Sequence, residues 1–181
     1  LDARHTSAEA DGNDHRTLAG GVHAAGITAH TALRAYDEEL AHAIFDISFW
    51  GAVNFMQVCS IAKLSNSAAS YVLFSSIAAS EGLKGKFAYS AAKAAVNTAA
   101  KSFAKEIARR KQRVNTILPG WVDTAMTQDS EDTTDVQSIV NQELLGIGKP
   151  ADVTGMILFL LSDRAAWITG AHIPVDGGYL A

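Results

Sequence analysis

Cysteine is almost absent from this sequence, since Cys59 is the only one in 181 residues. A single thiol cannot form an intramolecular disulfide, which excludes a disulfide-stapled scaffold and favours a reducing compartment. The residues around Cys59 are apolar and helix-like, so we interpret it as a small buried hydrophobe rather than as a nucleophile. No metal site is predicted either.

Long apolar runs and clusters of positive charge are missing as well. Without a run of about 18 apolar residues no membrane-spanning helix is predicted, and the polar N-terminus does not look like a signal peptide. Acidic residues outnumber basic ones, 19 to 15. The one dense basic run, residues 105–113, follows a helical pattern, where cations favour the helix C-terminus. We therefore expect no nucleic-acid partner, no membrane partner and a cytoplasmic location.

The sequence does contain an alternation of strand-like and helix-like segments, in a composition that is ordinary for one globular domain at 48% hydrophobic residues. Short apolar segments predict buried parallel strands over 20–26, 70–76, 113–120 and 172–178. Helical patterns cover residues 37–64, 88–110 and 151–162. The alternation predicts an α/β fold, a doubly wound parallel sheet of the Rossmann-like kind.

Two segments do not follow the alternation. Residues 1–19 are polar and predict an irregular N-terminal remnant before a single domain over residues 20–181. Residues 121–145 are polar too and predict a loop with a helix. In the helix predicted over residues 37–64, the apolar residues at helical spacing are Leu40, Ile44, Ile47, Val53, Met56 and Ile61.

The start of the helix predicted over 88–110 holds a tyrosine and a lysine among small residues, in "FAYSAAKAAV". Tyr89 and Lys93 are four residues apart, so both side chains lie on one face of a helix. A tyrosine with an ordinary pKa near 10 is a poor base, and a nearby cation makes it more useful by favouring the phenolate. Alone, such a pair is also a common surface cation–π or snorkelling pair.

Two serines, Ser75 and Ser76, end the strand predicted over 70–76. The carboxyl ends of parallel strands are where open α/β sheets bind ligands. Tyr89 follows thirteen residues after Ser76, so a serine hydroxyl there would hydrogen-bond a substrate carbonyl while the tyrosine protonates it. The alternative is that the two hydroxyls only cap the strand.

Five motifs in order resemble the short-chain dehydrogenase/reductase family over roughly residues 18–181. They are "GGVHAAG", "FSSIA", "YSAAK", "VNTILPGWVDTAM" and "ITGAHIPVDGG". The second half of this set is nearest in type to bacterial 3-oxoacyl-carrier-protein reductases. The resemblance implies an enzyme that uses NADP or NAD to interconvert a carbonyl and an alcohol by hydride transfer.

The resemblance also implies roles for individual residues. Tyr89 would be the general acid or base, Lys93 would lower its pKa and bind the nicotinamide ribose, and Ser76 would orient the carbonyl. Asn54 matches the family asparagine that holds a proton-relay water. The residues that would contact the cofactor, together with Tyr89 and Lys93, are Ala25, Gly26, Pro119, Gly120, Val122 and Thr124.

The sequence departs from the family pattern at its front. His23 and Ala24 stand where the family usually has two asparagines, and the interval from Asn54 to Ser76 is a few residues short. No glycine-rich phosphate turn precedes residue 20, and Gly146 and Gly148 lie far from any first strand.

Only 19 residues precede the strand at 20–26, whereas two βαβ steps need about 60 or more. We therefore expect the N-terminal cofactor-binding strands to be missing from this chain, with Asp2 as a candidate for the family aspartate near the adenine ring. For the same reason the sequence does not separate NAD from NADP.

Two other functions stay open at this point. The chain could be a non-catalytic scaffold or partner subunit of the same fold without cofactor, or an epimerase or dehydratase that uses the same Tyr–Lys pair. The expected partners are a small-molecule carbonyl or alcohol, in one version linked to an acyl carrier, and a second copy of the chain in a homodimer or homotetramer. Residues 77–88 and 121–145 would set substrate specificity.

Overall fold

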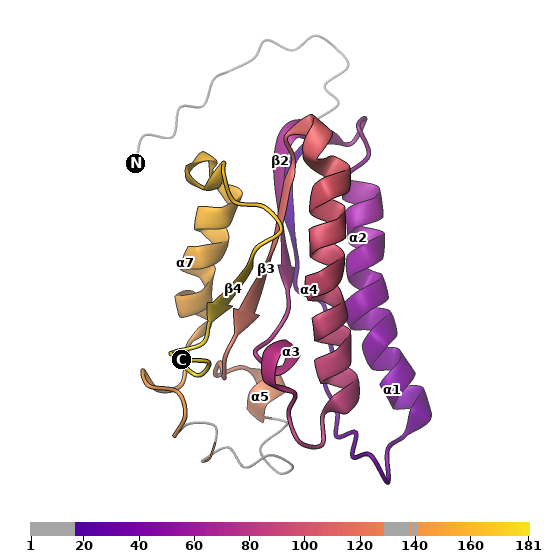
Figure 1. Cartoon of the computed structure of the whole chain (residues 1–181), viewed down its shortest axis with the longest axis vertical. Coiled ribbons are helices and arrows are strands. Elements are labelled where there is room, and N and C mark those ends of the chain that lie inside the picture. Colours follow the sequence, from indigo (N-terminus) through magenta and orange to yellow (C-terminus); the bar gives the residue numbers. More distant parts are fainter. Residues whose placement is uncertain (1–16, 129–137, 139–140) are drawn as a thin grey trace.

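The computed structural model describes residues 17–128, 138 and 141–181. A four-stranded parallel sheet in the order β1-β2-β3-β4 lies at the centre of this part of the chain (Figure 1). The strands are β1 (Leu18–His23), β2 (Ser65–Phe74), β3 (Arg113–Pro119) and β4 (His172–Val175). The predicted alternation of strand and helix and the parallel pairing are confirmed.

Helices cover both faces of the sheet, as the doubly wound prediction requires. One face is covered by α1 (Glu38–Phe45), the π-helical turn η1 (Asp46–Trp50), α2 (Gly51–Cys59) and α4 (Phe87–Ile107), which continues into η2 (Ala108–Arg110). The other is covered by α7 (Pro150–Leu161), followed by η4 (Asp163–Ala165). The short helices α3 (Ala78–Glu81) and α5 (Ala125–Gln128) lie beyond the carboxyl ends of the strands (Figure 1).

The first strand differs from its prediction. It begins at Leu18, inside the segment expected to be irregular, and ends at His23 rather than at residue 26. It is not fully buried, because it is an edge strand among the described residues, and Val22 is 39% exposed. Gly20 lets it approach β2, since a Cβ there would lie 2.3 Å from the Ser70 carbonyl oxygen. The remaining expectation for residues 1–16, including Asp2, lies outside the described residues.

The helical segment of residues 38–59 is shorter than predicted, and its buried face includes only part of the predicted apolar set. Its buried positions are spaced by four and are Ile44, Ser48, Ala52 and Met56. By contrast, Leu40, Ile47 and Ile61 are 37–47% exposed. The prediction is thus confirmed for Ile44 and Met56 and wrong for the exposed residues, because the π turn changes the phase of the helix midway.

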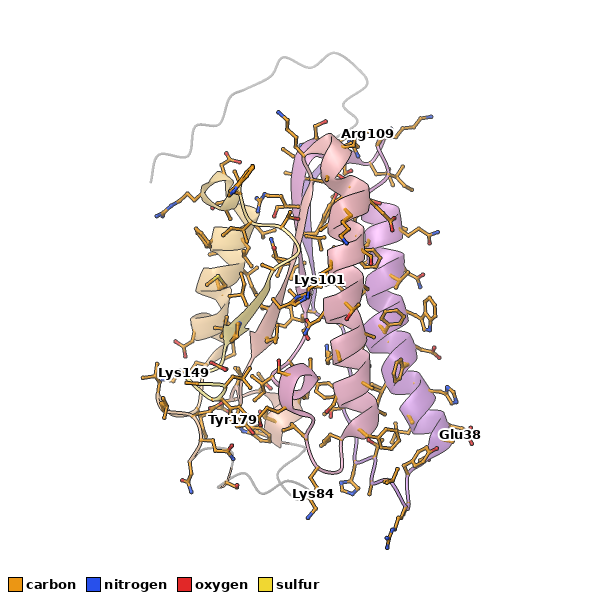
Figure 2. The ribbon with its side chains drawn as sticks, in the orientation of Figure 1. Glu38, Lys84, Lys101, Arg109, Lys149 and Tyr179 are labelled. Atoms are coloured by element: carbon orange, nitrogen blue, oxygen red, sulfur yellow. The ribbon has the colours of Figure 1, made fainter. Side chains whose placement is uncertain are left out.

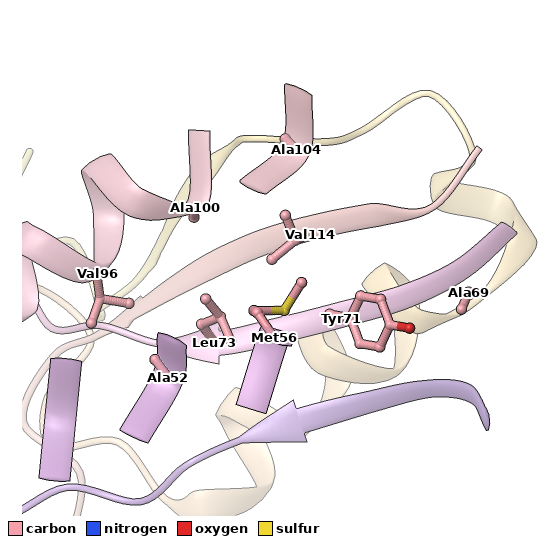
Figure 3. Close-up of a cluster of buried hydrophobic side chains, with 9 residues drawn as sticks. All are labelled: Ala52, Met56, Ala69, Tyr71, Leu73, Val96, Ala100, Ala104 and Val114. Atoms are coloured by element: carbon pink, nitrogen blue, oxygen red, sulfur yellow. The ribbon is translucent and has the colours of Figure 1, made fainter. Parts of the chain in front are cut away.

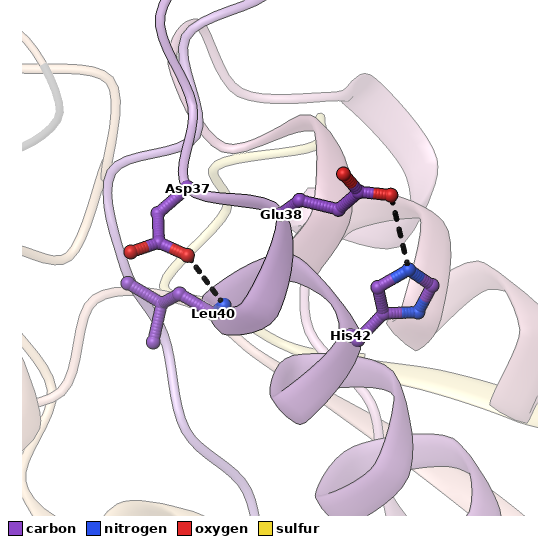
Figure 4. A network of polar contacts seen from close by, with 4 residues as sticks. All are labelled: Asp37, Glu38, Leu40 and His42. Atoms are coloured by element: carbon purple, nitrogen blue, oxygen red, sulfur yellow. Dashed lines mark hydrogen bonds and ion pairs between the residues drawn. The ribbon is translucent and has the colours of Figure 1, made fainter.

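The start of α1 is set by a side-chain cap. Asp37 accepts a hydrogen bond from the backbone N–H of Leu40 at 3.0 Å (Figure 4), which satisfies one of the free donors at the helix start. One turn on, His42 and Glu38 pair at 3.8 Å with both side chains at least 75% exposed (Figure 4). Such an exposed pair adds little stability, so the cap is the contact that defines the boundary.

The core on the α4 side is built from small residues on the helix and larger ones on the sheet. Figure 3 shows Val96, Ala100 and Ala104 of α4 over the β-strands, with Met56 of α2 beside them. The alanines let α4 lie close to the sheet, where Tyr71 and Leu73 are completely buried. Full burial of such a side chain contributes about 1.5–3 kcal/mol. A second cluster under α7 contains Val72, Ile117, Val153, Leu160 and Ala165.

The basic run of residues 105–113 does more than end its own helix. Arg110 donates to the carbonyl oxygen of Ser60, just past α2, at 3.1 Å. Arg113 donates to the carbonyls of Leu160 and Ser162, at the end of α7, at 2.8 and 3.0 Å. The predicted association of cations with helix C-termini holds, but two of the cations serve neighbouring helices, because only the fold brings those carbonyls within reach.

Candidate active site

The start of α4 is tied to the end of β2 by two reciprocal hydrogen bonds. Lys93 Nζ donates to the carbonyl oxygen of Phe74 at 2.9 Å, and Ser75 Oγ donates to the carbonyl oxygen of Lys93 at 3.1 Å. Parallel strands end here at one edge of the sheet, the edge at which open α/β folds bind ligands. The hydroxyl of Ser75 is therefore structural, which leaves Ser76 as the serine available for chemistry.

Ser76 and Tyr89 interact through their side chains. Ser76 Oγ accepts from the backbone N–H of Ala78 at 3.2 Å, and its side chain lies near enough to Tyr89 to affect the pKa of the phenol. Burial raises the pKa of Tyr89, and the nearby Ser76 side chain opposes that rise. A hydroxyl that stabilises phenolate is suited to stabilise a carbonyl oxygen next to it.

Lys93 completes the group on the same helix as Tyr89. Its Nζ atom lies 5.6 Å from the centre of the Tyr89 ring, over the ring face. The side chain is only 4% exposed, and burial lowers the pKa of Lys93 to about 8. The net shift of the Tyr89 pKa is upward, and the opposing contact comes from Ser76.

The surroundings of Lys93 fit the ribose of a nicotinamide nucleotide. An ammonium group has three N–H donors, and the bond to Phe74 uses one of them. Gly26 lets the backbone pass close to the ammonium, since a Cβ there would lie 3.2 Å from Lys93 Nζ. Ala25, the preceding residue, is exposed. Lys93 and Gly26 are the residues that would hold the sugar hydroxyls of a bound cofactor.

His23 is the residue of β1 that approaches this group. Burial and the positive charge of Lys93 lower the pKa of His23. Its ring lies 5.7 Å from the ring of Phe55, and its Nε2 atom would be 3.1 Å from a Cβ on Gly51. Because the imidazole is held next to a cation, its neutral form is favoured at neutral pH.

The predicted turn after β3 forms as one compact unit. Gly120 N donates to the carbonyl of Val175 at 3.1 Å, and Val122 pairs with Gly148 in an isolated β-bridge. Thr127 stabilises the turn, because its hydroxyl lies within hydrogen-bond distance, 2.7 Å, of the carbonyl oxygens of both Val122 and Thr124. Pro119 ends β3 at the base of this turn.

Sequence reasoning missed three residues near this edge. Thr127 could have been found from its spacing of three from Thr124, which is typical of local Ser/Thr hydrogen bonding. Glu143 is 5% exposed and accepts from the backbone N–H of Trp121, but nothing in its local sequence indicates burial. Ser48 is a buried polar residue in an otherwise apolar stripe of spacing four, and that stripe was the missed signal.

The structure does not place Asn54 with this group. Asn54 is exposed, on the same side of the helix as Trp50 and Val58, which are each 52% exposed. Ser48, on the opposite and buried side, is the helix residue that faces Lys93 and Gly26.

The C-terminal segment closes the same end of the molecule. Tyr179 lies at the end that also holds Lys84 and Lys149, away from Arg109 (Figure 2). Tyr179 packs in a small cluster with Ile77 and Trp121, so the segment is in contact with the loop that follows Ser76. Within the described residues, no helix is both long and apolar enough to cross a membrane.

These features define a Rossmann-like α/β domain with a serine, a tyrosine and a lysine gathered at the carboxyl edge of its sheet. A family model described as enoyl-(acyl carrier protein) reductase matches residues 3–180. The chain belongs to the short-chain dehydrogenase/reductase family.

Individual relatives agree with this membership. The 3-oxoacyl-acyl-carrier-protein reductase FabG of Thermotoga maritima is 34% identical over 157 residues, which cover 87% of this chain and 64% of that protein. MabA of Mycobacterium tuberculosis, which is also described as a 3-oxoacyl-acyl-carrier-protein reductase, is 31% identical. The match covers 85% of this chain and 62% of that protein. The chain thus spans less than two thirds of the length of these curated relatives.

Solved structures show the same fold. A short-chain type dehydrogenase/reductase from Mycobacterium ulcerans superposes with a TM-score of 0.85 at 31% identity, covering 92% of this chain and 62% of the other. The ketoreductase LanV, solved with bound NADP, gives a TM-score of 0.82 at 23% identity over 91% of this chain and 63% of its own. At that identity LanV supports the fold alone.

Proposed function

We propose that this chain is part of an NAD(P)-dependent oxidoreductase that interconverts a carbonyl and an alcohol by hydride transfer. The observation behind the proposal is the contact between Ser76 and Tyr89 next to the buried ammonium of Lys93, at the carboxyl edge of a parallel sheet. With these two side chains near each other, a substrate oxygen placed between their hydroxyls would accept from both.

Each residue has a distinct task in the direction of reduction. A nicotinamide cofactor, when bound, would supply the hydride, and the residues of this chain act on the carbonyl oxygen. Ser76 donates a hydrogen bond to the carbonyl oxygen and holds it near Tyr89, and the Tyr89 hydroxyl gives its proton to that oxygen as negative charge develops there. Because the pKa of Tyr89 is raised by burial, the tyrosine holds its proton at neutral pH and is ready as an acid.

The substrate class follows from the relatives only as a proposal. FabG of Thermotoga maritima and MabA of Mycobacterium tuberculosis are named as 3-oxoacyl-acyl-carrier-protein reductases, which supports a 3-oxoacyl group on an acyl carrier as the first substrate to test. The wider proposal is a small-molecule carbonyl or alcohol. NADP is the first cofactor to test and NAD the second.

Titration with NADPH and NADH, followed by nucleotide fluorescence, separates this proposal from a scaffold without cofactor. If the protein is an oxidoreductase, the full-length protein should bind at least one of the two nucleotides saturably. If it binds neither, the scaffold without cofactor is the function that remains. Substrate turnover with no net change in the amount of reduced nucleotide would favour an epimerase or dehydratase.

The residue roles are tested by Tyr89→Phe, with Tyr71→Phe as a matched control. Each change removes one phenolic hydroxyl. That of Tyr71 donates to the carbonyl of Cys59 at 2.6 Å, within the core and away from Ser76. Tyr89→Phe should lower kcat by about 10²–10⁴ and retain nucleotide binding, whereas Tyr71→Phe should lower stability and keep kcat. Near-normal kcat in Tyr89→Phe would refute the assignment.

We further propose that the protein is a homodimer or homotetramer. The outer side of α1, η1 and α2 exposes a row of large apolar residues: Leu40, Ile47, Trp50, Val58 and Ile61. Apolar rows of this size are typical of interfaces. Light scattering should give a multiple of the subunit mass that falls in Trp50→Glu, and a monomer in the unsubstituted protein would contradict the proposal. The single cysteine supports a cytoplasmic location.

A further inference from the structure

Residues 143–148 join the turn after β3 to the segment that follows β4. On one side, the backbone N–H of Gly148 donates to the carbonyl oxygen of Trp121 at 3.0 Å. On the other, the backbone N–H of Leu145 donates to the carbonyl oxygen of Gly177 at 2.9 Å. A side chain on this segment can therefore act on two parts of the chain that lie far apart in the sequence.

The Glu143 side chain is buried at this junction. It is 5% exposed, its Oε1 atom accepts from the backbone N–H of Trp121, and its Oε2 atom is buried with no hydrogen-bond partner. The fit is close, because a Cβ on Gly120 would clash with Oε1 and would lie 2.8 Å from the Cα atom of Asp176. The carboxyl group thus fills the space between the turn and the segment after β4.

The charged groups that face Glu143 are acidic. Burial and the nearby Asp176 raise the pKa of Glu143, and the N–H of Trp121 opposes that rise. Tyr179 lies at the same end, where Glu81 of α3 and Glu143 both raise the pKa of its phenol. Within the described residues no ion pair neutralises Glu143. A buried carboxylate without a cation costs far more free energy than a neutral carboxyl group.

We propose that Glu143 carries a proton on Oε2 in the folded protein and in this neutral form is the positioning residue for the turn after β3, and that loss of the proton releases residues 143–148 from that turn. Oε1 already accepts the N–H of Trp121, so the proton belongs on Oε2. The ionised form would place a second negative charge beside Asp176. The consequence for a cofactor rests on the proposed function, because this turn contacts a cofactor only if the protein is an oxidoreductase.

The direction of the pH effect follows from proton linkage. A released Glu143 side chain is in water, where its pKa has the ordinary value of 4.5, whereas burial and Asp176 raise the pKa in the packed structure. Between the two values the packed form holds one proton more than the released form, so release becomes easier as the pH rises. The equilibrium constant for release should increase by up to about tenfold per pH unit in this window and be constant above it.

Amide hydrogen exchange, followed by NMR in the full-length protein, measures this release. The reporters are the N–H groups of Trp121, bonded to Glu143, and of Leu145, bonded to Gly177. After correction for the intrinsic exchange rate, their protection should fall by up to about tenfold per pH unit above pH 4.5 and then level off. Protection that stays constant from pH 4.5 to neutral pH would overturn the proposal.

Glu143→Gln and Glu106→Gln form a matched pair of variants. Glutamine has the shape and charge of a protonated glutamate, and its Oε1 atom can still accept from Trp121. In Glu143→Gln the protection of both amides should equal that of the unsubstituted protein at low pH and should no longer depend on pH. Glu106 on α4 is exposed, so Glu106→Gln loses the same charge and should keep the pH dependence. An equal decline in the two variants would refute the role of Glu143.

The proton is also observed without any variant. The carboxyl ¹³C resonance of Glu143, assigned through the backbone of the unsubstituted protein, should titrate with a midpoint above 4.5. A midpoint at or below 4.5 would overturn the proposal, whether or not Glu143→Gln folds.

The link to the cofactor has its own measurement. Bound NADPH or NADH should raise the protection of the Trp121 amide, because Val122 and Thr124 of the same turn are the expected cofactor contacts. A bound nucleotide that leaves this protection unchanged would refute the positioning role. A protein that binds neither nucleotide would contradict the proposed function, whereas the titration of Glu143 would still be measured, so the two failures are distinguishable.

Discussion

Replacing Lys93 by methionine should make the protein more stable at neutral pH while it abolishes turnover. Lys93 is 4% exposed, and burial lowers its pKa from 10.5 to about 8. Each unit of pKa corresponds to about 1.4 kcal/mol, so the buried charge costs the folded state about 3 kcal/mol at pH 7. Methionine has a similar length and carries no charge, so it fills the same space without that cost.

Part of this gain is lost with the hydrogen bond to the carbonyl of Phe74, which is worth about 1 kcal/mol. The net increase in the free energy of unfolding is then about 2 kcal/mol at pH 7. For a chain of this size it corresponds to a rise in Tm of roughly 4–8 °C. A functional group that destabilises its own fold is the expected compromise at an active site.

The pH dependence identifies the cause of the gain. The folded pKa of Lys93 lies below its unfolded value, so between about pH 8 and 10.5 the unfolded chain binds more protons than the folded one. The stability of the unsubstituted protein should therefore rise through this window relative to Lys93→Met. The advantage of the variant is full below pH 8 and disappears by about pH 10.5.

Urea denaturation of both proteins at several pH values measures this difference, and titrating groups that do not interact with Lys93 cancel between them. If the two free energies of unfolding run parallel from pH 7 to 10.5, the ammonium is not buried at a cost and the reasoning fails. A Lys93→Met variant that is less stable than the unsubstituted protein at pH 7 would also refute the reasoning, unless its m-value showed a changed folded state.

Further predictions concern the core, the turn at Gly26 and the helix face. Leu73→Ala, at a completely buried position, should cost about 2–5 kcal/mol, whereas Leu33→Ala, at a side chain 83% exposed, should stay within about 0.5 kcal/mol; urea titration compares them, and equal losses would contradict the core assignment. Gly26→Ala should weaken nucleotide binding measured by fluorescence, because its Cβ would lie 3.2 Å from Lys93 Nζ; unchanged affinity would show that the space is not used. Asn54→Ala, on the exposed side of α2, should leave kcat unchanged, and a large loss would restore the role that the family resemblance implies. Arg113→Met should lower the Tm by several degrees, because it frees the carbonyls of Leu160 and Ser162; an unchanged Tm would show that these bonds are replaced by water.

The fold could be predicted from local sequence patterns, because strands and helices of this kind differ in hydrophobic period and in composition. The segment "SYVLFSS" is rich in β-forming residues, and the structure places β2 there, although it starts at Ser65. The helix α4 was expected over residues 88–110 and spans Phe87–Ile107 with a final 3-10 turn to Arg110. Boundaries depended on contacts across the sheet, which no local pattern contains.

Only part of the candidate site could be predicted from the sequence. Tyr89 and Lys93 lie on one helix at a spacing that places them together whatever surrounds the helix. Asn54 was chosen from a motif on another helix, and the structure exposes it. Ser48 was overlooked, because whether a serine faces solvent or a buried lysine depends on the phase of a helix that a π turn changes.

The sequence by itself determined the parallel α/β class, the family and the pairing of Tyr89 with Lys93, because period, composition and a spacing of four act within one segment. Only the tertiary structure decided that Ser75 ties α4 to β2 while Ser76 lies near Tyr89, and that Ser48 and Lys93 both lie beside Gly26. Those contacts join segments that are far apart along the chain. Their distances and burial are set by how β1, β2 and the helices pack, and that packing is a property of the whole fold.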